Sequence, residues 1–473
     1  MLKKLFVFSI GPVFSALIGI VSTPLTSWLV APSEFALASM FSLFVSLSNA
    51  SISLGMEHAF AREYNLASDK LRLFNNIVLL PYIGSIILSL LLMLNYHYIT
   101  SALFGYPSLL LTILLIICIV LSVINCFFSN LLRMQERARS YSSRIIIYKL
   151  IHFVSLILIL LFFKRSGESI IIASVIAEIA NSTLLLSANP SFAKLTLENI
   201  DLKLIKKCLK YGLPMVPTFL LTWAFNSMDK VMLRSFASYR ELGVYAASFK
   251  FVSALTILQT AFSSYWLPTS YRWHEEGVSP SKYGKVSNAI SVLLFFLAGI
   301  VVILRFFISW LLSPDYSEAS RISIFLIFPP ILTTISYTTI SGIDFKRKTY
   351  LHIIIAGVSA GTNFILNWFL IPSYGALGAA AATSISATVL FWMRTLISRR
   401  LWWPFPLKLY IVNIMLLYVM VLVASTQVGL VFELLVLFFI IGYNAKEIKA
   451  LFRVIIKVFG QRVKSEKKGV SYD

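Results

Sequence analysis

Residues 222–236 read TWAFNSMDKVMLRSF and lie within a long apolar run of the chain. Of the 473 residues, 58% are hydrophobic and only 13% are charged, which is far more apolar than a soluble globular protein. Asp229, Lys230 and Arg234 thus fall inside a segment built for lipid. Charged groups there usually face a protein interior or a watery cavity, because lipid exposure costs at least about 2.5 kcal/mol each. The stretch predicts an all-α polytopic membrane protein with a polar interior.

Apolar runs long enough to cross a bilayer recur along the whole chain. A hydrocarbon core takes about 20 apolar residues per helix, and by that measure the sequence predicts about fourteen transmembrane helices. They cover residues 6–29, 36–60, 74–94, 108–132, 145–163, 169–188, 214–234, 242–266, 288–312, 320–342, 350–370, 376–397, 407–424 and 429–444. The first run is too long for a signal-peptide core and lacks a small-residue cleavage site, so we expect it to be retained.

Basic residues are distributed unevenly between alternate loops. If the N-terminus is cytoplasmic, the outer loops hold only Lys164, Arg165 and Arg240 of the 41 lysines and arginines. This positive-inside pattern predicts that both termini are cytoplasmic. The net charge of +21 is spread over short loops, so we expect membrane lipids rather than nucleic acid as the partner. The tail after Ala445 alternates basic and apolar residues, which predicts a helix lying on anionic lipid.

Motifs for cofactors and catalysis are absent from the sequence. GVSPSKYGKV (277–286) departs from the spacing of a nucleotide-binding P-loop, and His274-Glu275-Glu276 lacks the second histidine of a zinc protease. No predicted outer loop is long enough for a folded domain with paired carboxylates. The three cysteines lie in apolar runs or a basic loop and imply no disulfide framework. We expect no cofactor, no metal and no enzymatic activity.

A polar stripe runs along the predicted span 214–234. Its members recur at four-residue intervals and share one slowly winding face: Thr218, Thr222, Asn226, Lys230 and Arg234. Lys230 lies about 24 Å along the helix from Pro214, near the outer interface, so snorkelling to that interface stays open for Lys230 and Arg234. The shorter, acidic Asp229 fits that interpretation less well.

Two further ionisable residues are predicted near the middle of the bilayer. Lys250 lies about 13 Å into the span 242–266, where a lysine reaches neither surface easily. Glu178 is at a comparable depth and is either the partner of an ion pair or a protonatable coupling site. Arg305 is nearer the outer end of its span and could snorkel. Charged residues at the cytoplasmic ends of spans are interpreted as interfacial anchors: Glu57, His58, Arg62 and Lys149.

Several segments carry a resemblance to a known family. YGLPMVP (211–217), NSMDKVML (226–233) and ELGVYAASFK (241–250) resemble the start of the second half of bacterial polysaccharide exporters. NFILNWFLIPSYGALGAA (363–380) is similar to the hairpin between their eleventh and twelfth helices, with Pro372 and Gly375 at the turn. The family is the O-antigen, or Wzx-type, flippases of the MOP superfamily, which also holds the MATE drug exporters and the lipid II flippases.

The resemblance implies a MATE-like V of two six-helix lobes around a central cavity, with two helices appended. The implied parts are an N-terminal lobe at 1–190, a basic cytoplasmic linker at 191–213, a C-terminal lobe at 214–400, helices thirteen and fourteen at 401–444, and a basic cytoplasmic tail at 445–473. VAPSEFA (30–36) and YRELG (239–243) open corresponding spans of the two halves. We therefore expect parallel repeats.

The resemblance also implies a substrate and a direction of transport. Oligosaccharide repeat units on undecaprenyl diphosphate would cross from the cytoplasmic to the periplasmic leaflet of the bacterial inner membrane, coupled to an ion gradient. A polysaccharide polymerase and a chain-length regulator are the protein partners to consider. We expect the cavity to use Lys250, Lys230, Arg234, Asp229, Asn226, Thr222 and Arg305, and the coupling to use Glu178 and Asp229.

Two alternative functions stay open. A MATE-type drug or cation antiporter would share the fold, but its cavity should hold more acids than bases. A polysaccharide polymerase would share the multispan appearance and the glycan pathway, but such enzymes usually carry a large periplasmic loop.

Overall fold

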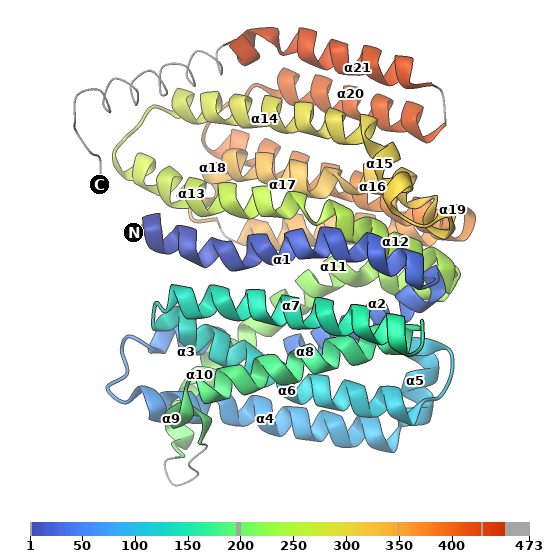
Figure 1. Ribbon diagram of the computed structural model, residues 1–473. Helices are drawn as coiled ribbons and strands as arrows, with labels where there is room; N and C mark the ends of the chain where they lie inside the picture. The colour runs from blue at the N-terminus through green and yellow to red at the C-terminus, as the bar shows by residue number, and fades with distance from the viewer. Residues whose placement is uncertain (1, 195–199, 349, 427–428, 450–473) are drawn as a thin grey trace, which may run out of the picture. The chain divides into compact units, whose positions relative to one another are not determined.

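The computed structural model describes residues 2–194, 200–348, 350–426 and 429–449. Within these ranges the chain forms α-helices and short 3-10 turns, and no strand (Figure 1). In lipid a helix satisfies its backbone hydrogen bonds internally, which is why apolar runs of this length fold as helices. The predicted fold class, an all-α polytopic membrane protein, is confirmed.

The helices follow one another along the chain with short connections. The first ten are α1 (Leu2–Leu29), α2 (Pro32–Ile52), α3 (Met56–Glu63), α4 (Lys70–Leu94), α5 (Tyr96–Phe104), α6 (Leu109–Met134), α7 (Ala138–Phe162), α8 (Gly167–Ser187), α9 (Pro190–Ala193) and α10 (Leu202–Gly212). Then come η2 (Leu213–Met215), α11 (Val216–Phe236), α12 (Tyr239–Val252), α13 (Leu255–Glu275), α14 (Pro280–Ile303), α15 (Arg305–Leu311), η3 (Pro314–Tyr316), α16 (Ala319–Leu326), α17 (Phe328–Thr339), α18 (Ser341–Phe345), α19 (Tyr350–Leu401), α20 (Leu407–Ser425) and α21 (Leu430–Tyr443).

The predicted spans correspond to these helices, with some breaks. Among the described residues, ten helices are long and apolar enough to cross a membrane, or eleven if the pair α12 and α13, bent by 44°, is one span. The helix α19 contains two predicted spans, because its backbone breaks at Gly375 (φ 53°, ψ −131°), a conformation that favours glycine. The charged α11 and the 14-residue α21 do not qualify by length and composition alone. The predicted count of about fourteen spans is therefore roughly consistent with the helices that the structure describes.

By packing, the chain divides into two compact units whose segments alternate along the sequence. Unit 1 comprises Met1–Ile257, Leu311–Ala319 and Ala360–Ala382, and unit 2 comprises Leu258–Trp310, Ser320–Ser359 and Thr383–Asp473. In unit 1, α1 packs on α7 and α2 packs on α12; in unit 2, α14 packs on α17, α20 and α21. The division into lobes at residue 214 stays a prediction. Most of the predicted tail helix lies outside the described residues, which end at 449.

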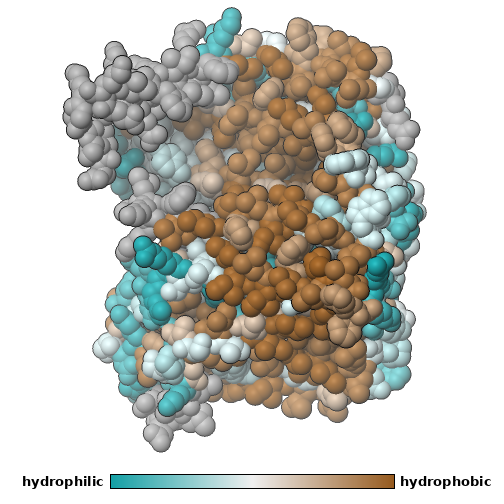
Figure 2. Space-filling view, viewed as in Figure 1, coloured by the Kyte–Doolittle hydropathy of each residue, from teal (hydrophilic) through white to brown (hydrophobic). Residues whose placement is uncertain are grey.

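Exposed hydrophobic side chains form the outer surface of the spans. On the helices of unit 1 that face the viewer in Figure 2, hydrophobic residues occupy the middle and hydrophilic residues gather towards the ends. On α4 and α7 the exposed members include Ile86, Leu90, Val154 and Leu158. An apolar band of this kind is suited to a lipid environment, in agreement with a multi-pass membrane protein.

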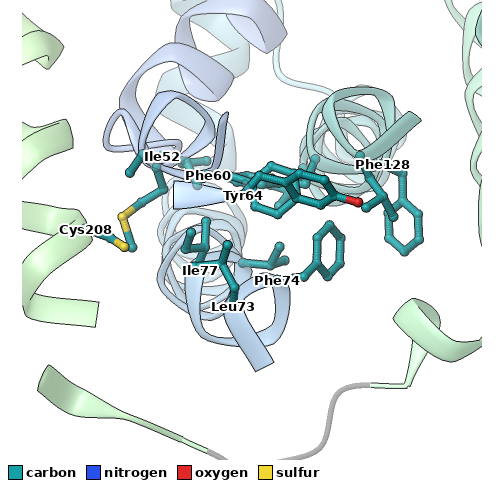
Figure 3. Close-up of a cluster of buried hydrophobic side chains, with 14 of the residues drawn as sticks. Ile52, Phe60, Tyr64, Leu73, Phe74, Ile77, Phe128 and Cys208 are labelled. Carbon is teal, nitrogen blue, oxygen red and sulfur yellow. The ribbon is translucent and has the colours of Figure 1, made fainter. Parts of the chain in front are cut away.

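A cluster of buried hydrophobic side chains lies where α2 meets α3 (Figure 3). The ring of Phe74 on α4 makes edge contacts with Phe60 on α3, at 5.6 Å between centroids, and with Phe128 on α6, at 5.1 Å. The linker helix α10 adds the buried Cys208 to the cluster. The segment predicted as a basic linker therefore contains a helix that is fixed to the core of unit 1.

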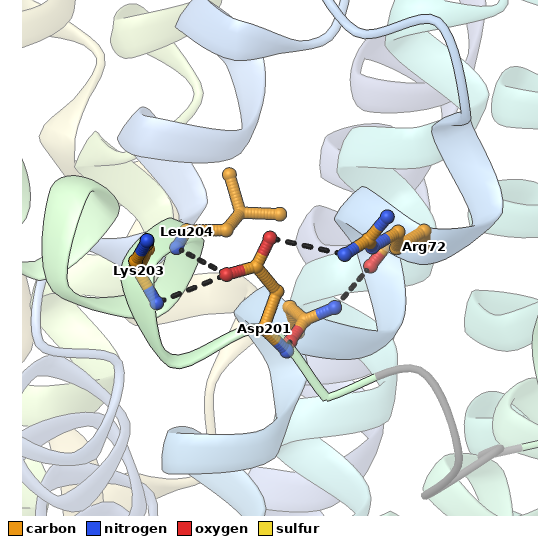
Figure 4. A network of polar contacts seen from close by, with 5 residues as sticks. Arg72, Asp201, Lys203 and Leu204 are labelled. Atoms are coloured by element: carbon orange, nitrogen blue, oxygen red, sulfur yellow. Dashed lines mark hydrogen bonds and ion pairs between the residues drawn. The ribbon is translucent and has the colours of Figure 1, made fainter.

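Asp201 begins α10 and joins it to α4 (Figure 4). Its carboxylate accepts hydrogen bonds from the backbone amides of Lys203 (3.0 Å) and Leu204 (3.1 Å) and from the guanidinium of Arg72 (3.1 Å). The Leu204 amide, together with the other donors, holds the pKa of Asp201 below its ordinary value. The backbone amide of Asp201 in turn donates to Asn76 at 2.6 Å.

Candidate functional site

Unit 1 encloses a cavity of about 610 Å³ between α1, α2, α7, α8, α11 and α12. This volume is within the range of known small-ligand sites. The walls formed by α1 and α2 consist mostly of small or hydroxyl-bearing residues, because these recur at helical spacing on the faces that line the cavity. The hydroxyl-bearing members are Ser15, Ser22, Thr26, Ser39 and Ser42.

The walls formed by α7, α11 and α12 are cationic. Lys149 on α7, Lys230 on α11 and Lys250 on α12 all line it, together with His152. No aspartate or glutamate is found among the described residues of the lining. Like charges in a partly dry space reinforce one another's potential, so the cavity favours anions.

The lysines contact aromatic rings rather than carboxylates. The Lys250 ammonium lies 4.4 Å from the ring centroid of Phe35, and that of Lys230 lies 5.6 Å from the ring of Phe249. Such cation–π contacts stabilise a lysine partially and leave its N–H groups able to donate to a ligand. No ion pair joins Lys250 to Glu178, although the structure describes both residues. The ion-pair alternative for Glu178 is therefore not supported with this lysine.

Lys149 was missed by the sequence-based reasoning, which interpreted it as an interfacial anchor. The reason is a boundary error: α7 begins at Ala138 rather than near residue 145. Lys149 is thus about 16 Å along the helix from its start, at the depth of the cavity. The prediction that Lys230 and Lys250 face a common space is consistent with their positions in the lining.

Asp229 lies beside the cavity in a separate buried cluster. The carboxylate is only 5% exposed. One of its oxygens accepts hydrogen bonds from Asn363 (3.1 Å) and Asn367 (2.7 Å), and the other accepts from the hydroxyl of Tyr245 (2.5 Å). Consecutive helix residues point about 100° apart, so Lys230 reaches the cavity while Asp229 faces α12 and α19.

The partners of Asp229 were not identified from the sequence as site residues. Asn363 and Asn367 are four positions apart in an apolar helix, so they occupy one face, and both are almost fully buried. That spacing was a usable signal, because a buried amide pair in a membrane helix must find polar partners.

Glu178 also belongs to a polar cluster, formed by α6, α7 and α8. Its carboxylate accepts a hydrogen bond from the side-chain amide of Asn125, whose own Oδ1 accepts from Asn181 (2.8 Å) and Ser182 (3.3 Å). The side chain of Tyr148, which lines the cavity, lies close to Glu178. Glu178 is therefore one side chain removed from the cavity.

The other predicted residues do not line the cavity. Thr222 and Asn226 hydrogen-bond to the backbone of their own helix, at 2.8 and 2.9 Å. Arg234 lies over the ring of Tyr239, 4.5 Å from its centroid. Arg305 belongs to unit 2, where it forms an ion pair with Glu433.

Comparisons with known proteins agree with this architecture. The sequence profile of a family described as polysaccharide biosynthesis protein matches residues 1–274. Curated protein sequences yield no match.

Solved membrane transporters share the fold. A structure of the lipid II flippase MurJ in an inward closed conformation is similar with a TM-score of 0.65 and 18% identity, over 95% of this chain and 100% of that one. An inward-facing multidrug resistance MATE family transporter of the MOP superfamily gives 0.56 and 15%, over 82% and 93% of the two chains. A mutant form of the Vibrio cholerae MATE transporter VcmN gives 0.56 and 14%, over 85% and 98%.

At these identities the likeness shows the fold alone. The family profile, however, covers more than half of the 473 residues. This chain therefore belongs to the family of polysaccharide biosynthesis proteins, and it has the fold of the MurJ and MATE transporters of the MOP superfamily.

Proposed function

We propose that this protein is a flippase for lipid-linked oligosaccharides. It moves repeat units of O-antigen or a related surface polysaccharide, attached to undecaprenyl diphosphate, from the cytoplasmic to the periplasmic leaflet of the bacterial inner membrane. The family assignment supports the polysaccharide part, and the similarity to the structure of a lipid II flippase supports the transport of a lipid-linked substrate.

The cationic cavity is the observation that carries the proposal. Lys149, Lys230 and Lys250 face a common space without a carboxylate in its described lining. A diphosphate offers several anionic oxygens to these ammonium groups, and each charge-assisted hydrogen bond is stronger in a low-dielectric site than in water. A drug or cation antiporter, the second candidate, requires the opposite charge in its cavity.

The hydroxyl-bearing walls suit the glycan part of the substrate. Ser15, Ser22 and Ser39 come from α1 and α2 and line the same cavity as the lysines. Small side chains leave room for sugar rings, and hydroxyl oxygens accept hydrogen bonds from sugar hydroxyls. Diphosphate at the lysines and sugars along the small residues would fill the cavity with complementary chemistry.

We assign ion coupling to the buried Asp229 and the half-buried Glu178. Protonation of Asp229, or a cation that replaces its amide donors after Asn363 and Asn367 rotate, would change the packing of α11 against α12 and α19. Glu178 is connected to the cavity through the side chain of Tyr148, which lies close to its carboxylate. Both clusters lie next to helices that carry cavity lysines, so the state of the ion can bias the binding of the anion.

The decisive experiment is the leaflet distribution of the lipid-linked repeat unit in cells depleted of this protein. Rescue plasmids would carry the parent protein, Lys250→Met, or Lys408→Met as a matched control, because Lys408 is exposed on α20 in unit 2. In depleted cells we expect lipid-linked repeat unit to accumulate on the cytoplasmic side. The parent protein and the Lys408→Met control should clear this accumulation, whereas Lys250→Met should not.

Other outcomes point to the alternatives. Normal translocation with unpolymerised glycan outside would indicate a polymerase. Unchanged glycan with altered drug sensitivity would indicate an antiporter. Full rescue by Lys250→Met at normal expression would refute the role of the cationic cavity.

A further inference from the structure

Two matched sets of contacts join distant parts of unit 1 at the end where α1 stops and α2 begins. The loop charges assign this end to the periplasmic side, and it is called the outer end below. Clasp A consists of Ser27, Trp28 and Val30 with Leu311, Ser313 and Tyr316. Clasp B consists of Leu103 with Arg234 and Tyr239.

Clasp A ties the first predicted span to the segment between the ninth and tenth. The indole of Trp28 donates to the carbonyl of Leu311 at 2.9 Å. The amide of Ser313 donates to the Ser27 hydroxyl at 3.2 Å, and the Tyr316 hydroxyl donates to the carbonyl of Val30 at 3.0 Å.

Clasp B is the counterpart, with the roles of the predicted halves exchanged. The seventh and eighth spans are tied to the segment between the third and fourth, since Tyr239 donates to the carbonyl of Leu103 at 3.1 Å. Arg234 donates to the same carbonyl at 3.5 Å while its guanidinium stacks on Tyr239. In each clasp, therefore, a tyrosine hydroxyl bonds to a backbone carbonyl of the other half.

Each half is braced internally by the same device. Glu34 near the start of α2 accepts a hydrogen bond from the Gly167 amide at 2.6 Å, and Glu241 near the start of α12 accepts one from Ala376 at 2.7 Å. Both donors lie at the N-terminal end of a following helix, where amides lack partners. These braces stay within a predicted half, whereas the clasps cross between halves.

The two halves also touch closely between the clasps. A Cβ built on Gly243 of α12 would overlap the carbonyl oxygen of Pro32 at the start of α2. No other residue type fits this backbone approach. The outer end of the cavity, whose lining includes Thr26 and Phe35, is thus covered by direct helix contact and by the clasps.

We propose that clasps A and B form the outer closure of the cavity and separate as a pair when the cavity opens on that side. Opening requires the halves to part at α2 and α12, and the hydrogen bonds of the clasps join the two halves beside this junction. The braces formed by Glu34 and Glu241 stay intact, because each of them lies within one predicted half.

Phe35 links this closure to the cavity. Its face carries the ammonium of Lys250, and its edge packs against Tyr316 of clasp A, with 6.3 Å between ring centroids and 86° between planes. An anion that draws Lys250 off the ring removes one of the contacts that position Phe35. This step rests on the proposed function, because it requires an anionic substrate; the closure itself does not.

The first test measures access to the cavity from outside. Thr26→Cys, in a background without Cys118, Cys126 and Cys208, would be labelled with a membrane-impermeant maleimide in right-side-out vesicles. Combining Tyr239→Phe with Tyr316→Phe should raise the labelling rate about 10-fold, because two crossing hydrogen bonds are lost. Tyr418→Phe is the matched control, since it removes a tyrosine hydrogen bond to Thr388 within unit 2.

An unchanged labelling rate in the double variant would overturn the proposal, and so would an equal rise in the control. The second test locks clasp A with Ser27→Cys and Ser313→Cys in the same background. Oxidation should stop clearance of lipid-linked repeat unit by the double variant, and a reductant should restore it. Oxidation should not change clearance by Ser27→Cys alone, because that variant lacks the second cysteine. Undiminished clearance by bridged protein would also refute the closure, whereas failure of the proposed function would leave the labelling result standing.

Discussion

Lys250 and Arg305 are both cations inside predicted spans, yet the structure gives them opposite surroundings. Arg305 donates to both oxygens of the fully buried Glu433, at 2.5 and 2.7 Å, and this pair fastens α21 to α15. Lys250 instead lies over the ring of Phe35 and beside the cavity, with no ion pair to any residue in the described part of the chain. Depth in the membrane therefore does not separate a structural cation from a binding one; the partner does.

The difference has an energetic basis. In a bidentate arginine–carboxylate pair, the attraction between the two groups largely compensates the cost of removing them from water. Removal of one partner therefore leaves a buried charge without compensation. An unpaired lysine costs stability in the empty protein. That cost is offset only when an anion binds, which is the behaviour expected of a substrate site.

Removal of one partner of the Arg305–Glu433 ion pair should give the largest effect on stability. Glu433→Leu leaves Arg305 without its partner and should destabilise the protein by about 3–5 kcal/mol. Adding Arg305→Met should restore much of that loss, because both charges are then gone. Thermal unfolding in detergent measures both, and equal stability of the single variant and the parent would contradict the structural role.

Asp229 sharpens the comparison as an anion whose hydrogen bonds are all supplied by protein. Asp229→Leu removes the acceptor shared by the amides of Asn363 and Asn367 and should cost about 1–3 kcal/mol of stability. Asp229→Asn should cost less but should abolish the dependence of transport on the ion gradient. Flux measured with and without the gradient tests this, and an Asn variant that still responds fully would exclude Asp229 from coupling.

Breaking the unpaired region should affect transport and spare the fold. We expect Lys250→Met to reduce clearance of lipid-linked repeat unit at least about 10-fold, the loss of roughly one charge-assisted hydrogen bond. Its melting temperature should equal or exceed that of the parent. Lys149→Met should show the same pattern more weakly, and a lowered melting temperature with normal flux in either variant would reverse the assignment.

The exposed pair of Arg72 and Asp201 should give the smallest effect, since half of the Arg72 side chain is in solvent. The pKa of Asp201 is depressed from its ordinary value of 3.8. Its contribution to stability is therefore complete above that value and is lost as pH falls through the lower folded pKa. The free energy of unfolding, measured from neutral to acidic pH, should fall less steeply for Asp201→Asn than for the parent. Identical profiles would show that these contacts contribute nothing to stability.

Hydropathy carries the information that predicts the helices, and the fold class it predicts is confirmed. The apolar runs identified the helices, and Gly375 marked the break in α19. Lys230 and Lys250 are predicted to face a cavity because a lysine in an apolar run is costly where it is exposed to lipid. Lys149 was missed through a helix boundary misplaced by about two turns, which changed its inferred depth.

Composition and helical periodicity by themselves determined that this chain is a multispan helical membrane protein with ionisable groups inside it, because lipid enforces long apolar helices and makes buried charge conspicuous. Tertiary structure alone decided which partners each of those groups meets. Whether Arg305 meets Glu433, whether Asp229 meets Asn363 and Asn367, and whether three lysines share one cavity depend on contacts between helices far apart in the chain. Spacing along one helix does not encode those contacts, because a single helix specifies which residues share a face but not what that face will meet.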